Sequence, residues 1–231
     1  MKREREIIRK KAAELTNAAE FFEKHAGFHP DDAPAKYGGG VQAAWKAIND
    51  QLEVAILFDC EEIKEICENE VVLVSGISFT GEMPPRILKD SDSVFSYVIT
   101  LCGFEELKNT MTDIMALYFM DAWGTAFAEA GQAWLGKYVK SLLEEEGLTR
   151  THLWSPGQHE FSLANQRSLF SILKPEEVGC TLTKTLMMVP VKSVSGIMGV
   201  TSPEVKDHLL PCDFCKLGAT CPASKRGCAE L

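Results

Sequence analysis

Residues 154–157 read Trp-Ser-Pro-Gly, residues 180–190 read Cys-Thr-Leu-Thr-Lys-Thr-Leu-Met-Met-Val-Pro, and residues 192–196 read Lys-Ser-Val-Ser-Gly. Proline fixes φ and glycine has no Cβ, so the first piece predicts a tight turn whose backbone can approach a ligand. The other two pieces predict a Thr-rich strand, a corner at the proline and a strand of small residues. Small residues there either let a large planar group lie close to the sheet or pack the strand under a helix.

This order of pieces resembles the reactivation (activation) domain of vitamin B12-dependent methionine synthase. In that family the loop and the following strand form a groove that binds S-adenosylmethionine (SAM) and presents its methyl group to a corrinoid. The middle of the chain adds to the resemblance, because Thr100-Leu101-Cys102-Gly103 precedes a helix that carries Asp121-Ala122 and Glu129. The resemblance spans residues 50–200 and suggests a stand-alone member of the family with a C-terminal cysteine cluster.

The resemblance implies an α+β fold, with a twisted, mainly antiparallel sheet flanked by helices. The order of predicted elements agrees with it: residues 71–74 and 93–101 are rich in β-branched and aromatic side chains and predict strands. Residues 104–146 predict a long helical segment with a break near Gly124 or Gly131.

The N-terminal region predicts an amphipathic helix and a linker. Apolar side chains recur at near-helical spacing over residues 2–25, and the glycine triplet at 38–40 is typical of a flexible join. We therefore divide the chain into an N-terminal helix and linker at 1–40, an activation-domain-like domain at 41–207 and a Cys-rich metal-binding segment at 208–231.

The resemblance also implies a cofactor site, and the chain departs from the family there. The implied cofactor-binding residues are Glu129, Trp154, Ser155, Pro156, Gly157, Gln158, Ser193, Ser195 and Gly196. The family has an Arg that pairs with the SAM carboxylate where this chain has Leu153, and a Tyr where it has Gln158. Thr125 stands where methionine synthase relatives have a SAM-contacting Glu. Arg150 is either a substitute for the missing Arg or an ordinary surface residue, and SAM binding stays open.

The last twenty residues contain four cysteines with the spacing C-x2-C-x5-C-x6-C: Cys212, Cys215, Cys221 and Cys228. Four thiolates in a short segment fit the ligand shell of zinc or of an iron–sulfur cluster. The segment has too few apolar residues for a core, so a metal would supply its order. A disordered thiol-rich tail and a redox-active Cys212–Cys215 pair remain alternatives. The other four cysteines are expected to be ordinary buried thiols.

Composition narrows the class of protein. The chain has 231 residues, 45% of them hydrophobic, which is ordinary for a globular protein. Its net charge of −9 argues against nucleic-acid binding, which needs clustered Lys and Arg. Neither a signal peptide nor an apolar stretch of membrane-spanning length is evident, so we expect a cytoplasmic protein without a membrane partner.

Two functional hypotheses follow. In the first, the protein docks on a separate corrinoid (cobalamin) protein or B12-dependent methyltransferase and assists its reductive reactivation, with SAM as a possible methyl donor and an iron–sulfur cluster in the tail as electron relay. In the second, it is a non-catalytic module that binds a corrinoid protein and has a structural zinc in its tail. Whether the protein is an enzyme is left open by the sequence.

Overall fold

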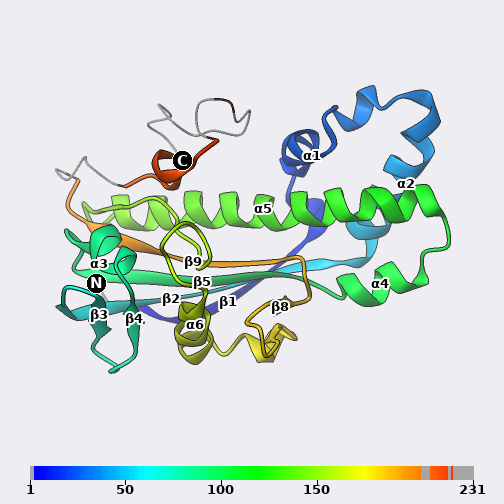
Figure 1. The fold of residues 1–231 in the computed structure, drawn as a ribbon. Helices are drawn as coiled ribbons and strands as arrows, with labels where there is room; N and C mark the ends of the chain where they lie inside the picture. The colour runs from blue at the N-terminus through cyan, green and yellow to red at the C-terminus, as the bar shows by residue number, and fades with distance from the viewer. Residues whose placement is uncertain (1–2, 204–208, 218–219, 221–231) are drawn as a thin grey trace.

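The computed structural model describes residues 3–203, 209–217 and 220, and within them a curled, seven-stranded antiparallel sheet forms the centre of the molecule (Figure 1). The strand order is β4 (Ser78–Thr80), β3 (Glu70–Leu73), β2 (Glu53–Ile66), β5 (Ser93–Cys102), β9 (Ser193–Thr201) and β6 (Thr149–Arg150). The remaining strand, β1 (Arg3–Lys11), pairs with the first half of β2, while β3 pairs with its second half. The predicted strands at 71–74, 93–101 and 193–196 are confirmed.

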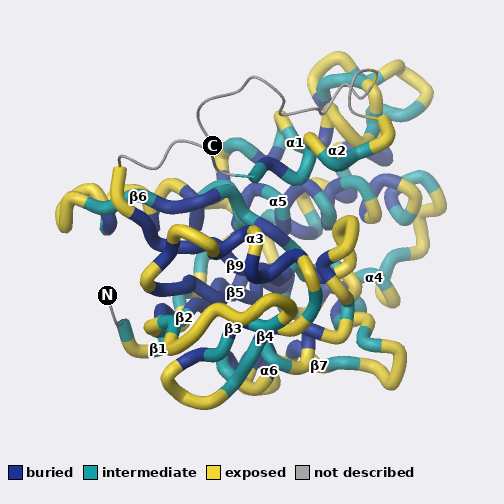
Figure 2. Tube along the Cα trace, turned by 60° about the vertical axis from the view of Figure 1, so that its left-hand side comes forward, coloured by how far each residue is buried: buried dark blue, intermediate teal, exposed yellow. Residues whose placement is uncertain are grey.

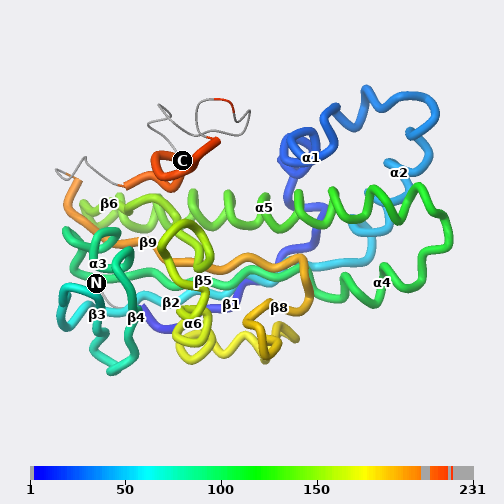
Figure 3. The backbone as a smooth tube through the Cα atoms, viewed as in Figure 1, coloured from blue at the N-terminus to red at the C-terminus, as the bar shows by residue number. Residues whose placement is uncertain are grey.

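Helices cover both faces of the sheet. The helix α5 (Ile114–Glu144) lies along one face, with α1 (Ala18–Ala26) and α2 (Ala35–Gln51) packed against it (Figures 1 and 3). The helices α3 (Met83–Leu88) and α6 (Gln166–Leu173) pack on the opposite face. Side chains alternate along β5. Phe95, Tyr97 and Ile99 therefore join the core under α5, while Val94 and Val98 join the core on the face covered by α3 and α6. Buried residues accordingly run along β5 and β9 (Figure 2).

The long helical segment is divided at a different place from the predicted one. A short helix, α4 (Phe104–Thr110), ends before residues 111–113, and the Asp113 carboxylate then caps α5 by accepting from the backbone N–H groups of Met115 and Ala116. The helix continues through Gly124 and Gly131. A Cβ at Gly131 would lie 2.9 Å from Val54 Cγ1, so this glycine allows close packing on the sheet and the predicted break is wrong.

The predicted N-terminal helix over residues 2–25 is wrong in its first half. Residues 3–11 form β1, and only residues 18–26 form the helix α1. The strand is rich in Arg and Lys, as is common for edge strands, and Lys10 lies over the Trp134 ring with Nζ 4.5 Å from its centroid. The near-helical spacing arose because apolar residues of β1, Ile7 and Ile8, and apolar residues of α1, among them Ala18 and Phe22, fall in one series along the sequence.

The predicted glycine linker at 38–40 is also wrong, because these residues lie within α2. Gly39 is exposed and a Cβ there would have no neighbouring group within 4 Å, whereas a Cβ at Gly40 would lie 2.6 Å from Met115 Cβ. Gly40 therefore lets α2 approach α5 closely. No helix in the described part of the chain is both long and apolar enough to cross a membrane.

Candidate functional site

The candidate site begins on the edge strand that pairs with β9. Arg150 pairs with Val200 and Trp154 pairs with Ile197. Between these two pairs the edge strand advances by four residues, whereas β9 advances by three. The extra residue makes a bulge, in which the Gly199 N–H donates to Thr151 Oγ1 at 2.8 Å. Bulges change the direction of a strand, and this one leads the chain out of the sheet into the Trp154–Gly157 turn.

The predicted Pro-Gly turn is present, and its polar groups satisfy one another. Gly157 has φ 95°, and the N–H of Gln158 donates to Ser155 O at 3.1 Å. The N–H of Ser155 donates to Gln158 Oε1 at 2.9 Å. The Gln158 side chain, which replaces the family's aromatic residue, thus occupies a backbone donor that an open turn would offer to a ligand.

The space over Gly196 is filled by protein. A Cβ at this position would overlap both the Trp154 carbonyl oxygen and the Tyr97 hydroxyl. That hydroxyl accepts a hydrogen bond from Gln132 Nε2 at 2.7 Å and also bonds the Ser155 side chain. Burial raises the pKa of Tyr97 to about 12, and the two hydrogen bonds offset only part of this rise. Gly196 therefore admits Tyr97 rather than a planar ligand.

The two serines of the predicted groove lie on the other face of the sheet. Ser195 is buried and donates to Gln166 Oε1 at 3.0 Å. The Ser193 hydroxyl lies 2.7 Å from both Thr100 Oγ1 and the Pro190 carbonyl oxygen. Both hydroxyls therefore have partners inside the protein, and the structure does not bring them together with Gly196 on one surface.

The helix residues of the predicted site lie apart from the Pro-Gly turn. Glu129 pairs with His25 of α1, with Oε1 3.2 Å from Nε2. Thr125 accepts from Lys192 Nζ at 3.0 Å, and the same ammonium pairs with Asp121 Oδ1 at 2.7 Å. Glu129 thus faces α1, and Thr125 joins a polar cluster that links α5 to the start of β9.

The described residues do not fit the family's contacts to the SAM carboxylate. Leu153 packs against the α5 core at the position of the family's Arg. Arg150 is buried, and its guanidinium donates to the carbonyl oxygens of Gly136 and Thr151 at 3.1 Å each. The positively charged guanidinium therefore binds backbone carbonyl groups beneath the sheet edge and does not take the place of the family's Arg at the turn.

A segment near the C-terminus lies against the turn. Trp154 is fully buried, and its Nε1–H donates to the Leu209 carbonyl oxygen at 3.0 Å. The Phe214 ring packs edge-on against Trp154 at 5.7 Å between centroids and contacts His159 at 5.9 Å. The Arg86 guanidinium lies over the same ring, with Cζ 5.3 Å from its centroid. Residues 209–214 therefore cover one side of the candidate site.

Two of the four tail cysteines are described. Cys212 lies in a 3₁₀ turn over Pro211–Phe214 and Cys215 follows it, whereas Cys221 and Cys228 lie outside the described residues. Within the described part of the chain, no three His, Cys, Asp or Glu side chains gather as a metal site.

The cysteines outside the tail are not all buried. Cys67 is exposed, against expectation. Burial raises the pKa of Cys60 to about 12 and also raises the pKa values of Cys102 and Cys180, which keeps these groups as neutral thiols near pH 7.

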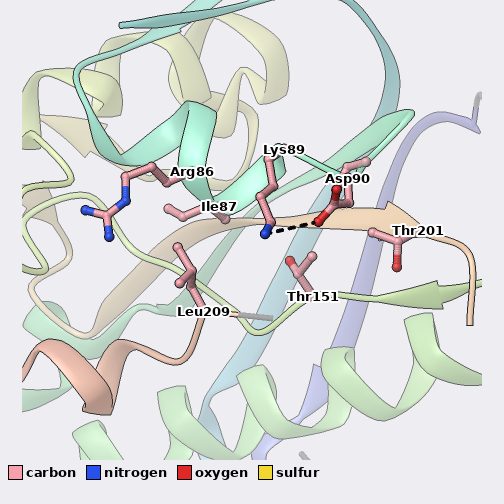
Figure 4. Close-up of a pocket in the computed structure, with 8 residues that line it drawn as sticks. Arg86, Ile87, Lys89, Asp90, Thr151, Thr201 and Leu209 are labelled. Atoms are coloured by element: carbon pink, nitrogen blue, oxygen red, sulfur yellow. Dashed lines mark ion pairs between the residues drawn. The ribbon is translucent and has the colours of Figure 1, made fainter. Parts of the chain in front are cut away.

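Neither of two cavities among the described residues is lined by the Trp154–Gly157 turn. One, between α3 and the sheet edge, is lined by Lys89, Ser91, Thr151 and Thr201 among others, and the Arg86 side chain points away from Lys89 (Figure 4). Its volume of about 10 Å³ suits a single water molecule, which would give the buried Ser91 hydroxyl a partner. A larger hollow of about 440 Å³ lies beside β1 and the second half of β2.

Comparison with known proteins supports the fold. No protein-family model matches the sequence, and a search of curated proteins finds no match. Among solved structures, the chain is similar to the MetH reactivation domain bound to AdoHcy, with a TM-score of 0.61 and 15% sequence identity. The match covers 87% of this chain and 79% of the other. The predicted fold is therefore confirmed: the protein has the α+β fold of a methionine synthase reactivation domain.

Sequence reasoning missed the two aromatic residues that organise the site. Tyr97 lies in a strand in which alternate residues are apolar, so nothing marked its hydroxyl as a contact of the Pro-Gly turn. Phe214 lies between Cys212 and Cys215. An aromatic side chain inside a Cys-x-x-Cys motif is unusual in an otherwise polar segment. It could have indicated that this segment packs against the rest of the protein.

Proposed function

We propose that this protein binds a separate corrinoid protein or B12-dependent methyltransferase and assists its return to the active state. The observation that carries the proposal is the similarity in fold to the MetH reactivation domain over 87% of the chain. Residues 157–160 of the turn are exposed, and they follow the buried Trp154, against which the partly buried Phe214 packs. An exposed loop next to a buried aromatic side chain suits recognition of a protein surface.

Reactivation of an oxidised corrinoid needs one electron, which converts Co(II) to Co(I). We propose that Cys212 and Cys215, with Cys221 and Cys228, hold a metal in the tail. A reduced iron–sulfur cluster bound there would transfer one electron to Co(II) and would itself be oxidised, so that an external one-electron reductant would have to reduce it again. The contact of Phe214 with Trp154 favours this arrangement because it holds the first two cysteines beside the proposed docking loop.

The similar MetH reactivation domain is bound to AdoHcy, so SAM or a related compound is the first ligand to consider for this chain. We propose no step through SAM. The Arg and Tyr of the family pattern are replaced by Leu153 and Gln158, and the Ser155 N–H already has a partner. The chain's own groups instead stabilise the turn: Gln158 closes it, and Tyr97 and Gln132 support it from below.

A second candidate is a non-catalytic module that binds a corrinoid protein and has a structural zinc in its tail. The satisfied polar groups of the turn favour it, because a surface used only for docking does not require open ligand contacts. The metal distinguishes the two candidates. Iron with stoichiometric acid-labile sulfide in anaerobically purified protein supports the electron relay, and zinc without sulfide supports the module.

Binding is the first test of both candidates. Calorimetry with a purified corrinoid protein should show saturable binding, weakened at least tenfold by Glu160→Lys, which reverses a charge on the exposed loop. Glu23→Lys, the same change at an exposed position of α1, should bind like the unchanged protein. Equal weakening by both variants would remove the loop from the interface, and absence of binding would contradict the proposal.

A further inference from the structure

We infer that this protein forms a two-fold symmetric dimer through an exposed apolar strip, in which a hairpin of one copy packs on the start of α5 of the other. The hairpin consists of β7 (Thr181–Leu182), β8 (Met188–Val189) and the turn between them. This inference goes beyond the proposed function, because dimer formation requires no corrinoid partner.

The strip gathers exposed apolar side chains from two parts of the chain. Its members are Ile114 and Tyr118 of α5, and Met187, Val189 and Val191 of the hairpin and the link to β9. They make up five of the ten large hydrophobic side chains that are exposed within the described residues. Together they expose on the order of 500 Å², a size at which apolar patches often serve as interaction sites.

Helical spacing places the α5 half of the strip beside the hairpin half. Ile114 and Tyr118 are four residues apart and share one side of α5 with Asp121, three residues further on. Asp121 Oδ1 lies 2.7 Å from Nζ of Lys192, which directly follows Val191 in the chain. The two halves of the strip therefore meet at this ion pair.

The polar groups where the halves meet already have partners. The N–H of Val191 donates to Glu105 Oε1 of α4 at 3.3 Å, and α4 lies between the start of α5 and the hairpin (Figures 1 and 2). Lys192 neutralises Asp121, and its own side chain is only 10% exposed. A contact over this centre therefore buries no polar group without a partner.

The charges at the two ends of the strip favour a second copy of this chain as the occupant. Lys184 is exposed in the turn of the hairpin, and Asp113 is exposed at the start of α5. A two-fold axis through the middle of the strip brings the lysine of each copy to the aspartate of the other, so the strip is complementary to itself. The same axis brings Met187 and Val189 onto the α5 half of the strip.

Sedimentation equilibrium of the full chain tests the dimer. An interface of this size belongs to the small, reversible class, so we expect a Kd between about 1 and 100 µM. Tyr118→Glu and Met187→Glu should each weaken dimerisation at least tenfold, because each brings a charge into the apolar contact. Val74→Glu, the same kind of change at an exposed apolar residue after β3, should dimerise like the unchanged protein. A monomer at all concentrations, or equal weakening by all three variants, would overturn the inference.

A mixture of the two strip variants tests the two-fold arrangement. In a mixed dimer of Tyr118→Glu with Met187→Glu, both changes fall in one of the two equivalent contacts, and the other contact is unaltered. The equimolar mixture should therefore contain more dimer than either variant alone at the same total concentration. A mixture that sediments like the separate variants would overturn the pairing of the hairpin with α5.

Lys184→Gln and Asp113→Asn test the contact between the charged ends, and asparagine keeps the N-cap of α5. Each change should weaken the dimer by roughly two- to fivefold, and the double variant should be no weaker than the singles. Additive weakening would show that the two residues do not meet. A monomeric protein whose Tyr118→Glu variant loses binding to a corrinoid protein would assign the strip to that partner and overturn the dimer. Matching circular dichroism spectra would show that the variants are folded.

Discussion

The Tyr97 hydroxyl occupies the space that a side chain on Gly196 would need. The two residues are directly paired across β5 and β9, and the hydroxyl reaches past Gly196 to Ser155 at the base of the Pro-Gly turn. The pair thus connects the centre of the sheet to the proposed docking loop. The missing side chain at Gly196 therefore allows Tyr97 to support the loop from inside the protein.

Gly196→Ala should therefore destabilise the fold by about 2–3 kcal/mol, because the methyl group would overlap a backbone carbonyl as well as the tyrosine. Urea unfolding followed by circular dichroism measures the change. A loss below about 0.5 kcal/mol would show that Tyr97 and Trp154 move aside easily.

The free energy of unfolding should fall above pH 10 because of Tyr97. Its pKa rises from an ordinary value of 10.0 to about 12 in the folded state, so the unfolded chain loses its proton first as the pH increases. Stability is unaffected below pH 10, and about 2–3 kcal/mol is lost between pH 10 and 12.

Tyr97→Phe isolates this contribution in urea titrations at pH 9 and pH 11. The variant should lose less stability between these pH values than the unchanged protein. It retains Cys60, whose raised pKa gives a loss in the same range that is common to both proteins. Identical pH dependence would mean that Tyr97 is not desolvated.

Gly39 and Gly40 form a matched pair of adjacent helix residues. Gly39→Ala should stabilise the protein by about 0.5–1 kcal/mol, because the site is exposed and alanine favours a helix. Gly40→Ala should destabilise it by at least about 1 kcal/mol, because the methyl group meets Met115 at the contact of α2 with α5. Thermal unfolding tests both, and equal effects would contradict the position of these residues in α2.

The double substitution Leu153→Arg/Gln158→Tyr tests the loss of the SAM contacts. It restores two side chains of the family pattern, and a bidentate Arg–carboxylate contact is worth about 1.5–3 kcal/mol, or about tenfold or more in affinity. We expect calorimetry to show SAM binding at least tenfold tighter in the variant than in the unchanged protein. Tight binding by the unchanged protein would show that other groups replace the missing Arg.

Much of the fold was readable because local chemistry and tertiary structure agree. β5 is a nine-residue run without charge that continues to Cys102, and the Pro-Gly turn requires the positive φ that Gly157 adopts. β2 was missed although it lies between β1 and β5, because the buried run at its start has no period that separates a strand from a helix.

The site was less predictable than the fold because it depends on pairings distant in sequence. Ser195 and Gly196 are neighbours in sequence yet face opposite sides of β9. The residues of the Ser193–Gly196 motif, which were predicted to form one surface, therefore lie on two opposite faces of the sheet. The Phe214–Trp154 contact joins residues sixty positions apart, and composition does not show that a polar tail packs on a buried indole.

The most direct test of the proposed function is the reduction of a corrinoid protein followed by electron paramagnetic resonance. A purified corrinoid protein in the Co(II) state would be treated without oxygen with a limiting amount of titanium(III) citrate, with and without this protein. We predict that the Co(II) signal disappears faster in its presence, and that Glu160→Lys removes the acceleration while Glu23→Lys retains it. An unchanged rate, with no complex detected by gel filtration, would contradict a role in corrinoid reactivation.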